Sequence, residues 1–300
     1  PAPREEAPPP ADDAALERVY LGDTPSPEAV RLEHARVFFE ELSMMSQMRQ
    51  PDPGDVWHEL QPVEQRLLAR LDALMVLGPG VFPHLIKTLE ARPVPDPEMF
   101  WGVIFVHGCL VGDDALDAAL RLARSAPLHD PAFFDAVTDA LVTIPHAGLE
   151  PALLEWLRAA DPVLRRVAVA VLGRRRALAA QSMVPLLSDV DPDVVREAAA
   201  ALVPLDGPVD RAVLDGMMFH ADPAIAHAGM TAATVRAHFR SVVRAAELVA
   251  MGHGEHGYAL LHLATGGTAE QLPALRSAMA GPPSPLLSEA LGWAGMGLLL

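Results

Sequence analysis

Two histidines and a glutamate gather near the C-terminal end of the sequence, in the order His253-Gly-Glu-His256, with His262 a little further on. Imidazole and carboxylate groups are competent ligands for zinc or iron. Glycines at positions 252, 254 and 257 mark the same stretch as a turn between helices, where exposed histidines need no metal to explain them. We therefore expect no metal, no cofactor and no catalytic residue, and a metal-dependent enzyme using His253 and His256 is the alternative.

Arginines are concentrated in one region of the chain. Arg165 and Arg166 are followed closely by Arg174, Arg175 and Arg176. Guanidinium groups bind carboxylates or phosphates with two parallel hydrogen bonds, so this region can dock an acidic partner. The alternative interpretation is that the last three arginines form an ordinary solvated turn. We predict that the five arginines belong to a protein-binding surface.

The sequence gives little support for a known catalytic or nucleotide-binding motif, a disulfide or a membrane span. The sequence contains no Gly-x-Ser-x-Gly elbow, no phosphate-binding loop and no dinucleotide fingerprint. Its single cysteine, Cys109, excludes an internal disulfide, so we expect a reducing, cytoplasmic location. The longest apolar run, residues 99–112, is too short to span a bilayer, and we expect no membrane insertion.

The charge balance argues against nucleic acid as a partner. The formal net charge is −16, and residues 1–60 hold 13 acidic residues against 5 arginines. Binding to nucleic acid normally requires a basic face that displaces counterions, and an acidic field repels phosphate. We therefore expect another protein as the partner.

The elements that must position these residues follow from a repeated Asp-Pro pair. The pairs begin at Asp96, Asp130, Asp161, Asp191 and Asp222, with spacings of 34, 31, 30 and 31 residues. Aspartate accepts backbone N–H bonds at a helix N-cap, and proline fits the first helical position. Each pair therefore predicts the start of a helix, and the constant period predicts a repeat protein.

A second helix is predicted in each repeat, because apolar residues recur at helical spacing after each first helix. The predicted second segments are residues 115–124, 149–159, 178–188 and 209–219. Weaker copies continue the array, with a helix at 255–265 followed by one at 269–280, and a last first helix at 284–299. Helix pairs of this length bury their apolar faces by stacking on their neighbours. The fold class is therefore all-α, with no strand signal in a chain that is 5% aromatic.

The copies that begin at Asp161 and Asp191 resemble HEAT-type repeats. Arg166 aligns with Arg196, Ala168 with Ala198, and Leu172 with Leu202. The resemblance implies a right-handed α-solenoid in which Arg166 and Arg196 reach aspartates of adjacent repeats in a ladder. His227 and Asp135 stand in the place of this arginine in the flanking copies. Some HEAT-like proteins are di-iron hydroxylases with repeated His-Glu pairs, or resemble lyases, but here the single His-Glu pair lies at His58, outside the array.

The chain divides into three regions on this interpretation. Residues 1–25 are rich in Pro, Ala and acid and form a disordered or extended lead-in without the features of a signal peptide. Residues 26–95 form an N-terminal helical cap, with helices expected at 27–49, 62–77 and 82–91. Residues 96–300 form the repeat array. The last repeat is incomplete at Leu300, and we expect the natural protein to continue.

The leading interpretation of function is a non-enzymatic scaffold or adaptor for protein–protein interaction, because stacked repeats offer extended binding surfaces. Lys87 is the only lysine and asparagine is absent, which indicates a bacterial genome rich in GC. The order of helices along the chain also resembles a family of bacterial HEAT-like proteins, some of which are encoded beside type VI secretion effector genes. That resemblance implies a secretion or effector component as the partner.

Overall fold

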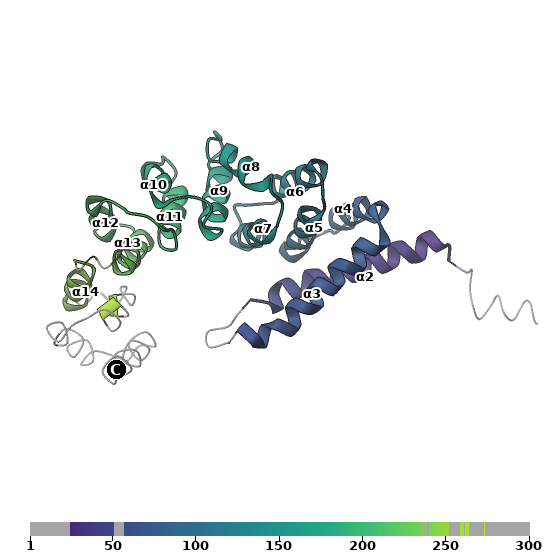
Figure 1. Cartoon of the computed structure of the whole chain (residues 1–300), viewed down its shortest axis with the longest axis horizontal. Helices are drawn as coiled ribbons and strands as arrows, with labels where there is room; N and C mark the ends of the chain where they lie inside the picture. The colour runs from purple at the N-terminus through teal and green to yellow at the C-terminus, as the bar shows by residue number, and fades with distance from the viewer. Residues whose placement is uncertain are drawn as a thin grey trace, which may run out of the picture. The chain divides into compact units, whose positions relative to one another are not determined.

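The computed structural model describes residues 25–50, 57–236, 238, 240–251, 259–260, 262–263 and 273. Across these residues it contains α-helices α2 to α14 and two short 3-10 helices, and no strand (Figure 1). The prediction of an all-α fold is confirmed. The predicted lead-in, except residue 25, and most of the predicted helices beyond residue 251 lie outside the described residues.

The chain forms two compact units, one up to Val106 and the other from His107. The boundary falls inside helix α5 (Pro97–Cys109). The cap-to-array boundary that the sequence predicts, between residues 95 and 96, stays a prediction.

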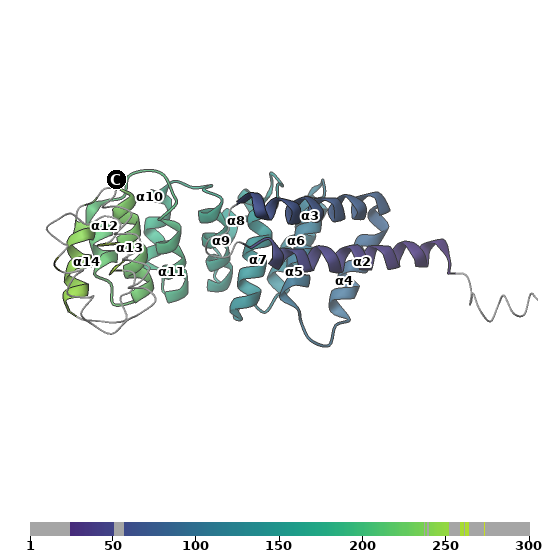
Figure 2. The ribbon, with the colours of Figure 1, turned by 90° about the horizontal axis from the view of Figure 1, so that it is seen from below.

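The first unit is built on two long helices that lie side by side in both ribbon views (Figures 1 and 2), α2 (Pro27–Met48) and α3 (Trp57–Leu77). Ser26 caps α2, because its hydroxyl accepts a hydrogen bond from the Ala29 amide at 3.1 Å. Helix α3 begins well before the predicted start at residue 62, and Pro62 lies inside it. The short helix η1 (Pro79–Val81) and α4 (Phe82–Glu90) complete the predicted cap.

The first helices of the repeats begin where the Asp-Pro pairs predict. They are α5, α7 (Pro131–Thr143), α9 (Pro162–Arg174), α11 (Pro192–Ala201) and α13 (Pro223–Val235). In every case the aspartate side chain accepts a hydrogen bond from a backbone amide of the first helical turn, at 2.9 to 3.0 Å. The proline gives up only an amide that the first turn leaves unpaired, so the pair both starts and caps the helix.

The second helices are less regular than the sequence predicts. Helices α6 (Asp113–Ser125), α8 (Leu149–Trp156) and α12 (Arg211–Met218) match their predicted segments. The segment predicted at 178–188 is broken into α10 (Ala180–Met183) and the 3-10 helix η2 (Val184–Ser188), because Pro185 cannot continue an α-helix. Helix α14 (Arg240–Ala250) follows α13 and was not predicted.

Within the second unit the helices form two layers. Figure 1 shows α7, α9, α11 and α13 side by side in one layer, called here the first-helix layer, with α6, α8, α10 and α12 in the second-helix layer. Small residues allow close packing: a methyl group added to Gly173 would lie 2.5 Å from the Cβ of Ala201 in the next repeat. The aligned pairs Ala168 and Ala198, and Leu172 and Leu202, are completely buried. This architecture is an α-solenoid, as predicted.

None of the described helices has the length and apolar character needed to cross a membrane.

Candidate functional site

Arg165 is held inside the repeat stack. Its guanidinium donates to both carboxylate oxygens of Asp189, from Nε at 2.9 Å and from Nη2 at 2.8 Å, and Nη1 donates to the carbonyls of Ala159 and Ala160 at 2.9 Å. Only 12% of its side chain is exposed. The hydrogen bond from Arg165 lowers the pKa of Asp189. Arg165 thus ties the loop before α9 to the loop before α11.

Arg166 lies between three first helices. Its guanidinium carbon is 3.7 Å from the ring centroid of Phe134 on α7, and its Nη2 donates to Glu197 Oε1 on α11 at 3.3 Å. Asp193 is further away, at 3.9 Å. Burial raises the pKa of Glu197, although Arg166 and then Arg174 oppose that effect. A cation over an aromatic face and beside a half-buried carboxylate joins the three helices into one packed group.

The ladder that the HEAT resemblance implies is present in an altered form. Arg196 reaches the adjacent repeat as expected, since its Nε donates to Asp222 Oδ2 at 2.6 Å. Arg166 bonds mainly to Glu197, with Asp193 at a longer distance. Both arginines therefore reach the adjacent repeat as predicted, but the acidic residue that they bind differs from one repeat to the next.

The three consecutive arginines lie at the end of α9 and in the turn that follows it. Arg174 is the last residue of α9, Arg175 is its C-cap, and Arg176 adopts a left-handed conformation with φ of 53°. Arg175 Nη1 donates to the carbonyls of Val142 and Ile144 in the preceding repeat, both at 2.8 Å. These carbonyls lie at the C-terminal end of α7, where a helix lacks its own donors.

Arg174 and Arg176 are the exposed members of the predicted set. Arg174 makes one long hydrogen bond, from Nη1 to Thr138 Oγ1 at 3.5 Å. Neither of the two forms an ion pair with a described residue. The structure therefore separates the five predicted arginines into three that fasten repeats together and two that face solvent.

Arg236 is a structural residue that sequence reasoning missed. Its Nη2 donates to the carbonyls of Leu202, the C-cap of α11, and Leu205 in the loop that follows, at 2.9 and 2.7 Å. Arg175 and Arg236 both stand fourteen positions after the aspartate of their repeat. The recurrence of arginine at this offset in alternate repeats is the sequence signal that could have predicted these bonds to the preceding repeat.

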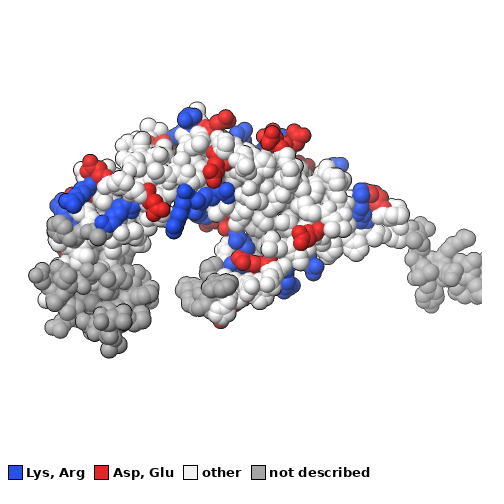
Figure 3. Space-filling model, in the orientation of Figure 1, with Lys and Arg blue, Asp and Glu red and all other residues white. Residues whose placement is uncertain are grey.

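The exposed side of the first-helix layer carries charges of both signs over α7, α9 and α11. We call it the central charged face, and it consists of Asp135, Arg166, Arg174, Asp193 and Glu197. Figure 3 shows basic and acidic atoms next to one another over this part of the chain, in place of a broad basic field. Arg174 is the one cation of this face that has no carboxylate partner among the described residues.

Of the histidines that the sequence analysis singled out near the C-terminal end, the structure describes His262. His253 and His256 lie outside the described residues. His262 is buried, with Nε2 3.3 Å from Thr231 Oγ1 and Nδ1 3.4 Å from Thr234 Oγ1. Burial, and then the neighbouring His227, lower the pKa of His262 to about 4, so its ring is neutral at physiological pH. The described residues contain no group of three potential ligands placed to hold a metal ion.

A comparison with known families finds a match in the central repeats. A family model described as HEAT repeats matches residues 150–233, which run from α8 into α13. No curated protein matches the chain. Residues 150–233 are thus similar to HEAT repeats, and they lie within the two-layer helical stack described above.

Two solved structures illustrate how far the likeness extends. An engineered protein from the Northeast Structural Genomics Consortium is 16% identical, covers 96% of this chain and 91% of its own, and gives a TM-score of 0.40. Human deoxyhypusine hydroxylase in complex with glycerol is 15% identical, with coverage of 89% and 98% and a TM-score of 0.33. Similarity at these TM-scores carries no conclusion about what this chain does.

Proposed function

We propose that this protein is a non-enzymatic scaffold that holds a partner protein on its central charged face. The contact residues are Arg174 of that face and the exposed Arg176, two residues further along the chain. The observation that supports the proposal is that some arginines are bonded between repeats while others are exposed to solvent. Arg165, Arg166 and Arg175 fix neighbouring repeats to one another, so Arg174 is presented from a rigid platform. A pre-organised cation loses little freedom when it binds a carboxylate.

The partner is expected to offer an acidic patch. Glu197 is half-buried beside Arg166, and Asp193 is close by, so an incoming carboxylate has one favourable position, next to Arg174. Nucleic acid is a poor fit, because the acidic residues of the face and the net charge of −16 oppose a phosphate backbone. We further propose a bacterial, cytoplasmic setting and a secretion or effector component as the partner, in line with the resemblance noted from the sequence.

Affinity capture from the native host tests this proposal. The wild-type chain is compared with the double variant Arg174→Glu/Arg176→Glu, and Arg121→Glu serves as the control because Arg121 is exposed on α6. We expect a protein recovered by the wild type and the control to be lost from the double variant. Equal recovery by all three would place the binding surface elsewhere.

A further inference from the structure

Asp135 of α7 adds an exposed negative charge to the central charged face. Arg166 occupies the equivalent position in the next repeat, but the two side chains do not form an ion pair. Arg166 lies over the ring of Phe134 and pairs with Glu197 of α11 instead, at 3.3 Å. No other cation among the described residues pairs with Asp135, so its charge is open to a partner.

Arg174 lies close to Asp135 without pairing with it. Arg174 Nη1 donates to Thr138 Oγ1, and Thr138 follows Asp135 by three residues, so it lies one turn further along the same face of α7. Both charges act on Glu197: burial raises the pKa of its carboxyl group, Arg166 and then Arg174 lower it, and Asp135 raises it again. Among its described residues the face therefore displays an unpaired cation and an unpaired anion about one helical turn apart.

The other charges of this face are already compensated. Asp193 pairs with Arg196 and lies 3.9 Å from Arg166, which also binds Glu197. The side chains of Arg166 and Glu197 are only 24% and 20% exposed, so a partner reaches them less easily than the exposed Asp135. A second carboxylate from the partner would therefore meet Asp135, a like charge. A cation in that place is attracted by Asp135 and by the net charge of −16.

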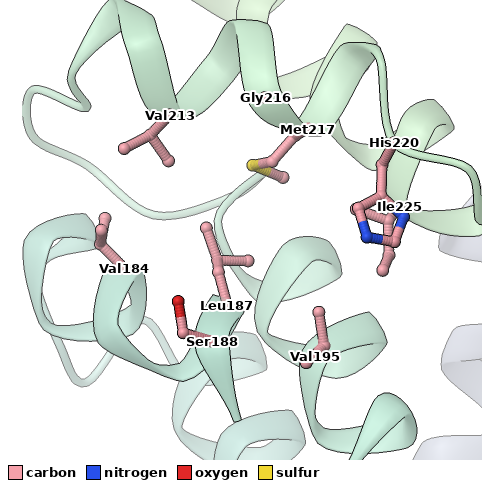
Figure 4. A pocket seen from close by; sticks show the side chains of 9 residues that line it. All are labelled: Val184, Leu187, Ser188, Val195, Val213, Gly216, Met217, His220 and Ile225. Carbon is pink, nitrogen blue, oxygen red and sulfur yellow. The ribbon is translucent and has the colours of Figure 1, made fainter.

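A cavity in the second-helix layer of the same repeats offers no such charges. It has a volume of about 250 Å³ and opens between η2 and α12, where Leu187 and Met217 face one another across it (Figure 4). No described residue that lines this cavity is an aspartate, glutamate, lysine or arginine. Gly216 lies in its wall, and a methyl group there would meet nothing within 4 Å. The cavity is therefore a place for a control substitution that changes shape without changing charge.

We propose that the partner presents to the central charged face a segment with a carboxylate and a cation about one helical turn apart. The carboxylate pairs with Arg174 and the cation pairs with Asp135. This inference rests on the proposed function and specifies the partner further, because an acidic patch alone would not satisfy both charges. Asp135 is then the residue that selects against segments that are acidic throughout, since it repels a carboxylate in the place of the cation.

Panning a phage-displayed library of random peptides on the whole chain, and in parallel on Asp135→Lys, tests this charge pattern. We expect the wild type to enrich peptides with aspartate or glutamate about three or four residues from lysine or arginine. Asp135→Lys should enrich peptides in which that cation is lost. A wild-type consensus that is acidic throughout would overturn this inference and keep the proposed function. A consensus without a carboxylate, or no enrichment on the wild type, would overturn both.

The affinity of the synthesised consensus peptide, measured by fluorescence anisotropy, then assigns each charge. Asp135→Lys should weaken binding about fivefold to tenfold, because repulsion replaces attraction, and changing the cation of the peptide to glutamate should restore it. Asp117→Lys is the matched control, since Asp117 is exposed on α6 and the net charge changes equally. Arg174→Glu should also weaken binding, whereas Asp117→Lys and Gly216→Leu should bind as the wild type does. Wild-type or tighter binding by Asp135→Lys would contradict the inference, and if Arg174→Glu also bound normally, the proposed function would fail with it.

Discussion

Arg175 and Arg236 perform the same task in two alternate repeats. Each donates hydrogen bonds to carbonyls at the C-terminal end of the preceding first helix. Carbonyls at the end of a helix lack intrahelical donors, and in each repeat one charged side chain satisfies two carbonyls at or just after that end. The stack is thus fastened by side chains as well as by apolar packing.

Replacing Arg175 should cost stability where replacing Arg174 does not. Arg175→Ala removes the donor to two carbonyls in the preceding repeat, and we expect a loss of about 2 kcal/mol in the free energy of unfolding. Arg174→Ala removes an exposed side chain, and the change should stay within about 0.5 kcal/mol. Urea unfolding followed by circular dichroism measures both, and similar losses in the two variants would refute the assigned roles.

His262 should make stability depend on pH. Its pKa is about 4 in the folded protein and 6.5 is the ordinary value, so the unfolded chain takes up a proton at higher pH than the folded one. Stability that is present above pH 6.5 is therefore lost as the pH falls from 6.5 towards 4. Thermal melts over this range should show a smaller decline in His262→Gln. An unchanged pH profile in that variant would mean that another group titrates.

At the scale of single elements, the Asp-Pro pair acts as a local start signal. Asp161 and Asp191 accept amide hydrogen bonds from the first turns of α9 and α11, at 2.9 Å in both cases. Asp161→Ala and Asp191→Ala should each lower the free energy of unfolding by roughly 1 kcal/mol, because the N-cap is lost. Differential scanning calorimetry measures the melting temperatures of both variants. Melting temperatures equal to that of the wild type would contradict the capping argument.

Glycines in the helices divide according to what they touch. A Cβ on Gly229 would lie 2.5 Å from the Cβ of Met217, whereas Gly216 faces open space. Gly229→Ala should destabilise the fold by about 1–3 kcal/mol through overpacking. Gly216→Ala should stabilise it by up to about 1 kcal/mol, because alanine is the better helix former. The midpoints of chemical denaturation of the two variants should shift in opposite directions relative to the wild type. Shifts in the same direction would contradict the packing described.

The elements also show what could be predicted from the sequence and what could not. Helix starts were predictable because the Asp-Pro signal acts within one turn. The break at Pro185 was predictable in principle, but apolar periodicity across residues 178–188 masked it. The roles of the arginines were not predictable, because Arg175 bonds to carbonyls more than thirty residues earlier and only the stacking of repeats brings them together.

At the scale of the whole molecule, the acidic charge of the chain determines how a partner can be attracted. The net charge of −16 repels acidic proteins at long range, so local contacts must supply the attraction. Arg174 and Arg176 stand out because the arginines around them are already bonded within the stack. The proposed scaffold therefore depends on a short-range contact, and its loss should appear mainly as faster dissociation.

The most direct test of this account is the affinity of the captured partner for three forms of the chain, measured by surface plasmon resonance at low salt. The account predicts that Arg174→Glu/Arg176→Glu binds about tenfold or more weakly than the wild type, with faster dissociation and unchanged helicity, while Arg121→Glu binds normally. Wild-type affinity in the double variant would contradict the claim that the central charged face is the binding surface.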